Sequence, residues 1–142
     1  MLWCALSLST RATDMSDYTE SRIDLQAVPA SVNTAWTTFD FGVPANVKKF
    51  HIEFMDLQIT NISGASVHNF DWYLSVDADG EHAITPVKTL QEWSDGKGAA
   101  KHYSAAISRS RSSGSRGVGL YLHIKLDHGS ATIAPFVEGA RI

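Results

Sequence analysis

Cysteine is almost absent from this sequence, and the missing thiols exclude several classes of protein. The only cysteine, Cys4, lies near one end of the 142 residues. A single thiol forms neither an intrachain disulfide nor a cysteine-based zinc cluster, and it leaves the redox compartment undetermined. Zinc deaminases combine a His-x-Glu motif with a later Pro-Cys-x-x-Cys. They are therefore excluded, although His51-Ile-Glu53 is present.

Long apolar runs are also missing, so the sequence predicts no membrane-spanning helix. The weakly apolar opening segment has no basic residue before it and is soon interrupted by Arg11 and Asp14. This pattern argues against both a spanning helix and a secretory signal. The composition, with 44% hydrophobic and 19% charged residues and a net charge of −3, is that of one ordinary soluble domain with a single core.

The motifs of common enzyme classes are absent as well. The sequence has no Gly-x-Ser-x-Gly elbow and no phosphate-binding loop, and the glycines of Gly114–Gly119 are wrongly spaced for a dinucleotide turn. We therefore expect a non-enzymatic protein with no catalytic residue, no cofactor and no metal site. A metal-dependent jelly-roll enzyme stays open only if His51, Glu53 and His123 converge.

The dominant positive signal is a hydrophobic period of two, which is typical of half-buried strands. It is clearest in Lys49–Ile59, Phe70–Val76 and Val118–Leu126. Apolar residues on one side of these segments should all be buried. They are Phe50, Ile52, Phe54, Trp72, Leu74, Leu120, Leu122 and Ile124.

About seven strands with turn residues between them predict an all-β fold. Shorter candidates are Ala35–Phe41, Ala83–Leu90, Tyr103–Ser108 and Ala131–Val137. Only Thr89–Trp93 and Ala99–Ala106 resemble short helices, and neither has a convincing apolar stripe with caps. We expect an antiparallel, jelly-roll-like β-sandwich over residues 23–142. Residues 1–22 lack the strand pattern and should form an extended N-terminal arm that contacts a partner.

The segment Asp77-Ala-Asp79-Gly-Glu81 can be interpreted as a calcium site or as a turn. Three carboxylates can converge on a hard cation, but an EF-hand loop needs glycine at position six and glutamate at position twelve. Counting from Asp77, the glycine comes fourth and Lys88 is twelfth. Asp79-Gly80 instead favours a tight reversal, with a strand beginning near Glu81.

Basic residues are concentrated late in the chain. The segment Gly96–Leu126 has six of the twelve lysines and arginines and no acidic residue. Its polar part, Ser108–Arg116, should be an exposed loop. A short patch without interleaved aromatics, in a net acidic chain, argues against nucleic acid binding. The basic segment is either a contact surface for an acidic partner or a solvated loop kept soluble by its charge. The candidate partner contacts are Lys97, Lys101, Arg109, Arg111 and Arg116.

The segment Trp36–Leu57 contains Gly42-Val-Pro44, Val47-Lys-Lys49 and the alternating Phe50–Phe54, and Ser63–Ser66 follows before the strand Phe70–Asp77. With these features the chain resembles a module of bacteriophage tail-fibre and related virion proteins. A Ser/Gly-rich stretch and the strand Gly117–Leu126 complete the resemblance, which covers roughly residues 31–137. Departures are the longer Asn61–Asn69 connection and the basic loop.

The resemblance implies a structural or attachment protein of a virion, in the tail fibre, elsewhere in the tail or as a capsid decoration. Such a protein would form homo-oligomers, contact other virion proteins and display loops to host-surface glycans. The alternative is a carbohydrate-binding module, in which Trp93, Trp36 or Tyr121 stacks on a sugar beside Asp95 or His123. Possible glycan contacts are therefore Trp93 and Tyr121.

Overall fold

The computed structural model describes residues 22–112 and 119–141, and these residues form only strands, turns and loops. The expectation of an extended arm over residues 1–22 lies outside the described part, except for Arg22, which opens the first strand. The strands are β2 (Arg22–Gln26), β3 (Ala30–Val32), β4 (Thr37–Asp40), β5 (Lys49–Thr60), β6 (Ala65–Ser75), β7 (Lys88–Asp95), β8 (Lys101–Ser112), β9 (Tyr121–Leu126) and β10 (Ala131–Arg141).

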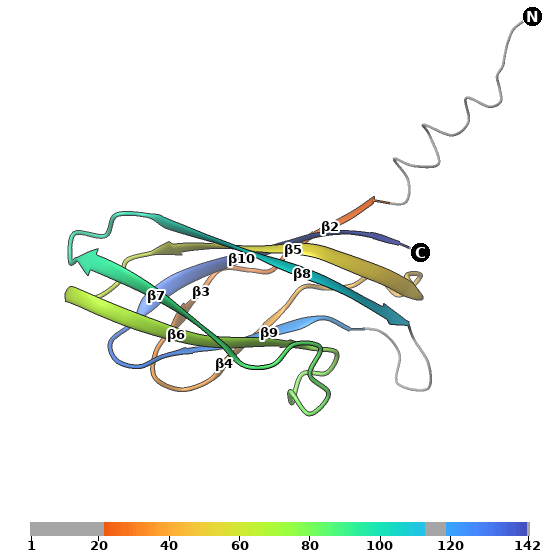
Figure 1. Cartoon of the computed structure of the whole chain (residues 1–142), viewed down its shortest axis with the longest axis horizontal. Coiled ribbons are helices and arrows are strands. Elements are labelled where there is room, and N and C mark those ends of the chain that lie inside the picture. The colour runs from red at the N-terminus through yellow and green to blue at the C-terminus, as the bar shows by residue number, and fades with distance from the viewer. Residues whose placement is uncertain (1–21, 113–118, 142) are drawn as a thin grey trace, which may run out of the picture.

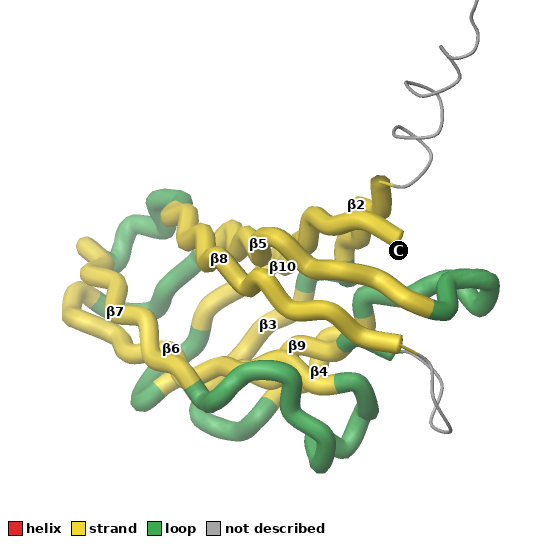
Figure 2. Tube along the Cα trace, turned by 45° about the vertical axis from the view of Figure 1, so that its right-hand side comes forward, coloured by secondary structure: helices red, strands yellow, loops and turns green. Residues whose placement is uncertain are grey.

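The strands form two antiparallel sheets packed as a β-sandwich (Figure 1). Sheet I has the order β2-β10-β5-β8, with β3 pairing beside β2 on the same edge of β10. Sheet II has the order β4-β9-β6-β7. Figure 2 shows the two yellow layers with green loops crossing between them at both ends. The predicted all-β antiparallel sandwich is confirmed.

The predicted strands are found with corrected ends. Of the segments that resembled helices, Thr89–Trp93 lies in β7, and Ala99–Ala106 lies in β8 from Lys101 onward. The strand expected near Glu81 begins only at Lys88. Ser108–Arg116 was wrongly predicted to be a loop throughout, because β8 continues to Ser112 by pairing with Lys49–Ile52 of β5. An edge strand pairs on one side only, so β8 tolerates this polar sequence.

The core lies between the sheets and is built from alternating residues of both. Sheet II contributes Phe70, Trp72 and Leu74 from β6, and Leu122 and Ile124 from β9, all fully buried. Sheet I contributes the inward residues of β5 and β10, including Leu57 and Ile133. Of the eight residues predicted to be buried, seven are. The exception is Phe54.

A β-bulge explains why the prediction for Phe54 is wrong. On β5, one residue lies between Ile52 and Phe54. The residues of β10 that pair with these two are adjacent, whereas the residues of β8 that pair with them have two residues between them. The extra residue, Glu53, shifts the alternation by one position, since successive side chains point to opposite faces. Phe50 and Ile52 therefore face inward before the bulge, whereas Met55, Leu57 and Ile59 do so after it. Phe54 is 46% exposed.

Backbone features of both neighbouring strands accommodate the bulge. Ser108 on β8 has a positive φ of 49°, which is uncommon for a residue with a side chain. On β10, a Cβ at Gly139 would clash with the carbonyl oxygen of His51. The irregularity thus crosses all three strands, and glycine at position 139 permits the close approach.

Proline is tolerated in the central strand β10 because of a break in its neighbour. Pro135 lies between the residues that pair with β3 and those that pair with β2. Its carbonyl oxygen accepts a hydrogen bond from the N–H of Ala27 at 3.1 Å, so its nitrogen also faces that side. The missing N–H therefore falls at the junction of two short edge strands and does not disturb the ladder to β5.

We predict losses of stability of different size for two alanine substitutions at apolar positions of the strands. Leu122→Ala should lower the free energy of unfolding by about 2–5 kcal/mol, because it leaves a cavity in the core. Phe54→Ala should cost less than about 1 kcal/mol, because the ring is half exposed. Chemical denaturation of both variants tests this, and a larger loss from Phe54→Ala would contradict the observed bulge.

Candidate functional site

The basic residues predicted to contact a partner are dispersed along one side of the sandwich. Lys97 precedes β8, Lys101 opens it, and Arg109 and Arg111 lie near its end. Lys101 and Arg109 are eight positions apart, which is about 26 Å along a strand. Arg111 lies opposite Phe50, and its Nε is buried without a hydrogen-bond partner among the described residues. Arg116 lies outside the described residues.

The aromatic residues predicted to contact a glycan do not form one platform. Trp93 is 57% exposed and lies opposite Val67 on β6. Tyr121 lies opposite Ser75, eight residues further along the same strand. The third candidate, Trp36, is 44% exposed but already has protein neighbours. Its ring contacts Tyr73 edge to face at 5.4 Å, and Lys125 Nζ lies 4.8 Å from its centroid.

His123 lies on the outer side of sheet II but is buried beneath this aromatic group. Tyr73 stacks on its ring with centroids 4.6 Å apart, and the exposed fraction of His123 is 3%. The Ser75 hydroxyl donates to the Asp77 carbonyl at 2.6 Å, which leaves its oxygen to accept from His123 Nε2 at 2.7 Å. Thr38 then donates to Nδ1 at 2.9 Å. Every polar atom is thus satisfied with the ring neutral.

Burial lowers the pKa of His123, and the charges of Asp77 and Asp79 offset this only in part. His123 is therefore a structural histidine covered by Tyr73. The enzyme alternative required His51, Glu53 and His123 to converge. They do not, since His51 and Glu53 lie on β5 of sheet I, whereas His123 lies on β9 of sheet II.

The reversal after β6 follows the expected turn. Gly80 has a φ of 76°, and its N–H donates to the Asp77 carbonyl at 3.1 Å. The carboxylates are used locally: Asp77 contacts the ring and N–H of His82, and Asp79 accepts from the N–H of Glu81. The hydrogen bond from His82 is the main reason that the pKa of Asp77 is lowered. The side chains of Asp77, Asp79 and Glu81 form no joint ligand set in the described structure.

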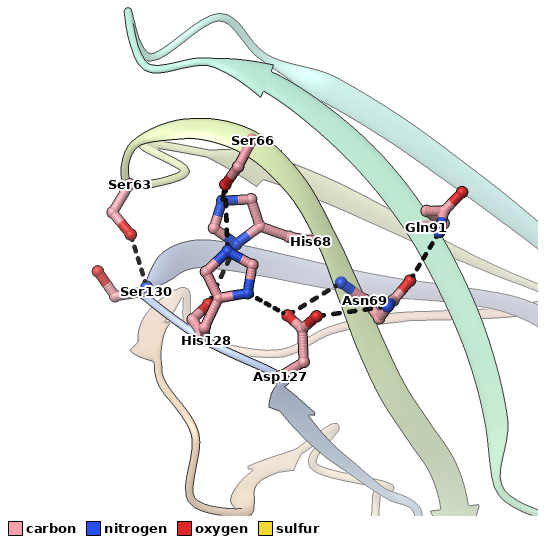
Figure 3. Close-up of polar contacts among 8 residues, drawn as sticks. All are labelled: Ser63, Ser66, His68, Asn69, Gln91, Asp127, His128 and Ser130. Atoms are coloured by element: carbon pink, nitrogen blue, oxygen red, sulfur yellow. Dashed lines mark hydrogen bonds and ion pairs between the residues drawn. The ribbon is translucent and has the colours of Figure 1, made fainter.

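A cluster of potential metal ligands that sequence reasoning missed lies at one end of the sandwich (Figure 3). His68 is on β6, and Asp127 and His128 are on the turn between β9 and β10. Ligand atoms of these three residues lie within 4.8 Å of one another. His68 is fully buried. Its position two residues before Phe70, on the inward face of the strand, was the only signal in the sequence.

The two imidazoles are held in a stacked pair. Their centroids are 4.2 Å apart and their planes differ by 17°. His68 Nδ1 lies 3.1 Å from the carbonyl oxygen of His128, and His128 Nδ1 lies 2.9 Å from Asp127 Oδ1. Both Nε2 atoms face Ser66 Oγ, at 3.2 Å from His68 and 3.1 Å from His128.

Asp127 is fixed from the other side by Asn69. The N–H of Asn69 donates to Oδ1 at 3.1 Å, and its side-chain amide donates to Oδ2 at 3.3 Å. Burial acts to raise the pKa of Asp127, but the Asn69 hydrogen bond and His128 outweigh it and the pKa falls below its ordinary value. Asp127 is thus an ionised acceptor for the His128 ring.

Ser66, His128 and Asp127 have the connectivity of a catalytic triad. The setting differs from that of a hydrolase in two ways. Ser66 lies within β6, paired with β7, and not on the sharp turn that presents a nucleophile. Its hydroxyl also contacts a second imidazole, that of His68. The group therefore orders side chains across two elements.

A shallow cavity of about 300 Å³ lies on the outer face of sheet I. Four strands contribute to it, and Phe136 supplies its aromatic wall. None of its polar side chains has a hydrogen-bond partner within the described part of the chain, so their donors and acceptors are available to a ligand. The lining residues are Gln26, Asp56, Gln58, His102, Ala134 and Phe136.

Comparison with known proteins adds little. No family model and no curated protein matches the chain. Among solved structures, it is similar to a chain in the structure of infectious bursal disease virus, Gx strain, with 10% identity and a TM-score of 0.18. The match covers 85% of this chain and 40% of that one. A likeness this weak supports neither a fold nor a function.

The described residues contain no helix long and apolar enough to cross a bilayer.

We predict that His123 makes the fold sensitive to acid. Its pKa is lower in the folded chain than the ordinary value of 6.5, so below that pH the proton binds the unfolded chain preferentially. Stability should be complete above this value and fall as the pH drops through the lower pKa of the folded state. His123→Gln should have a lower Tm at neutral pH but a flatter decline between pH 7.5 and pH 5.

Melting curves across this range measure the slope for the wild type and the variant. His102→Gln, which removes an exposed imidazole from β8, is the control for losing a histidine. Equal slopes for the wild type and His123→Gln would contradict the prediction.

Proposed function

We propose that this chain is a non-enzymatic structural or attachment module of a bacteriophage virion, which assembles with copies of itself and with other virion proteins. The similarity of Trp36–Leu57 and later segments to tail-fibre modules supports the virion role. The turn in this motif forms as its residues require, with the N–H of Val47 donating to the Pro44 carbonyl at 3.0 Å. We propose that the module lies in a tail fibre, elsewhere in the tail or on the capsid as a decoration protein.

The strand order is compatible with this role. When β2 and β3 are counted as one strand, sheet I contains the first, eighth, third and sixth strands, and sheet II the second, seventh, fourth and fifth. We infer a jelly roll from this order, since two interleaved Greek keys give the same alternation. Jelly rolls are common in viral capsid and lectin domains, so the fold is compatible with both candidate functions.

The observation that carries the assembly role is the long edge of β8. This strand has 12 residues, and no other described strand pairs with its outer edge. An unpaired edge is a template for another chain, and charged side chains on it either select a partner or prevent association. The basic Lys101 and Arg109 suit an acidic surface on a neighbouring copy, because the chain before Gly96 carries thirteen of its fifteen carboxylates.

Reversal of these charges should show whether they select a partner for the β8 edge or prevent its association. We expect the full chain to form a fixed oligomer, and Lys101→Glu with Arg109→Glu to weaken it at least tenfold, or about 1.4 kcal/mol. Light scattering after size-exclusion chromatography measures the mass. Lys48→Glu, on the connection between β4 and β5, is the matched control. A monomeric wild type at all concentrations would contradict assembly through this edge.

A second candidate function, carbohydrate recognition, is favoured by the cavity on sheet I. Two carboxamides, a carboxylate and an imidazole around one aromatic ring are groups that bind sugar hydroxyls and the apolar face of a pyranose. These residues differ from Trp93 and Tyr121, which the sequence had suggested. Asp56 lies directly opposite Phe136 in the ladder, so the polar and aromatic groups share one surface.

We predict that any glycan bound by the wild type on a glycan array will bind at this cavity. Calorimetry with Asp56→Asn and Gln58→Ala should then show at least a tenfold loss of affinity, because each variant loses a hydrogen bond to the sugar. Trp93→Ala should bind as the wild type does. The reverse pattern, with a loss only in Trp93→Ala, would place the glycan on sheet II and contradict the cavity.

A further inference from the structure

The hydrogen atoms of the imidazole cluster can be assigned from its acceptors. A carbonyl oxygen and a carboxylate only accept hydrogen bonds. Nδ1 of His68, facing the His128 carbonyl, and Nδ1 of His128, facing Asp127, must therefore both carry hydrogen. In neutral rings, this leaves a lone pair on each Nε2.

Both lone pairs are directed at the same hydroxyl. Ser66 has a single proton, which it can donate to one of the two Nε2 atoms at 3.1 and 3.2 Å. The other nitrogen then faces an oxygen lone pair, which is unfavourable. When both imidazoles are neutral, the single hydroxyl proton thus satisfies only one of the two nitrogens. A cation between the two Nε2 atoms would interact with both lone pairs.

We propose that His68 and His128 bind one divalent transition-metal ion of the zinc class through their Nε2 atoms. Imidazole nitrogen is a preferred ligand of zinc, copper and nickel. Metal-binding histidines characteristically donate their other N–H to a carboxylate or a carbonyl, which fixes the tautomer and the ring orientation. His68 and His128 each have such an acceptor here.

The ion lies beside the Ser66 hydroxyl, and water completes a tetrahedral coordination. Each nitrogen lies about 2.0–2.1 Å from zinc in proteins. Because the lone pair lies in the plane of the ring, one ring must turn out of the stacked arrangement on binding. The half-exposed His128 permits this movement more readily than the buried His68. Asp127 is a positioning residue, because its oxygens are already used by His128 and Asn69.

Binding would connect two elements at one end of the sandwich. His68 is on β6 and His128 is on the turn that carries the chain from sheet II to sheet I. This turn already contacts the β5–β6 connection, because Ser63 and Ser130 exchange two hydrogen bonds of 2.9 Å. The ion therefore stabilises the loops that close this end, independently of the proposed virion role.

Calorimetric titration of the full, untagged chain with Zn²⁺ tests the proposal. We expect saturable binding of one ion at this site, and a Tm that rises by roughly 5–10 °C at a hundredfold excess over Kd. His128→Ala should weaken binding at least tenfold, and Asp127→Asn by about ten- to hundredfold. His102→Ala and His51→Ala, which remove imidazoles from sheet I, should retain wild-type affinity, and Mg²⁺ should not bind.

Long-range ¹⁵N NMR of the wild type provides a readout that requires no variant to fold. Zn²⁺ should shift the Nε2 resonances of His68 and His128 together, while their Nδ1 atoms stay protonated. Binding weaker than about 1 mM, unchanged affinity in a folded His128→Ala, or zinc-dependent shifts confined to other histidines would each overturn the site.

Discussion

The shift in alternation at Glu53 is the constraint on which sheet I depends. β5 is central in its sheet and 12 residues long, and its apolar residues change parity between Ile52 and Met55. A regular strand would place one of these two sets in water. One extra residue on β5, matched by the positive φ of Ser108 and the missing Cβ of Gly139, lets both halves of the strand cover the core.

The same bulge determines what the surface presents. With Phe54 turned outward, the following residues Asp56 and Gln58 also face out, and they line the cavity beside Phe136. Their polar groups have no partner in the part of the chain that the structure describes. The candidate carbohydrate surface is thus a consequence of core packing, because each residue that enters the core fixes the direction of its neighbours.

The two histidine-rich regions differ in whether the nitrogens of their buried rings all have hydrogen-bond partners. His123 has a donor and an acceptor matched to one neutral tautomer, so its environment is complete without a ligand. His68 and His128 share a single hydroxyl between two lone pairs, so theirs is incomplete. Buried polar groups are nearly always satisfied. An arrangement that is one cation short therefore indicates a binding site more strongly than the presence of histidines alone.

The sequence by itself determined the all-β class, the strands in β5, β6 and β9, and the turn at Asp79-Gly80. These follow from local alternation and from the backbone freedom of glycine, which neighbouring residues set. Tertiary structure alone decided the exposure of Phe54, because a bulge arises from pairing with β8 and β10. It also brought His68 to His128, 60 positions apart. Contacts at such separations depend on strand order, which no local pattern encodes.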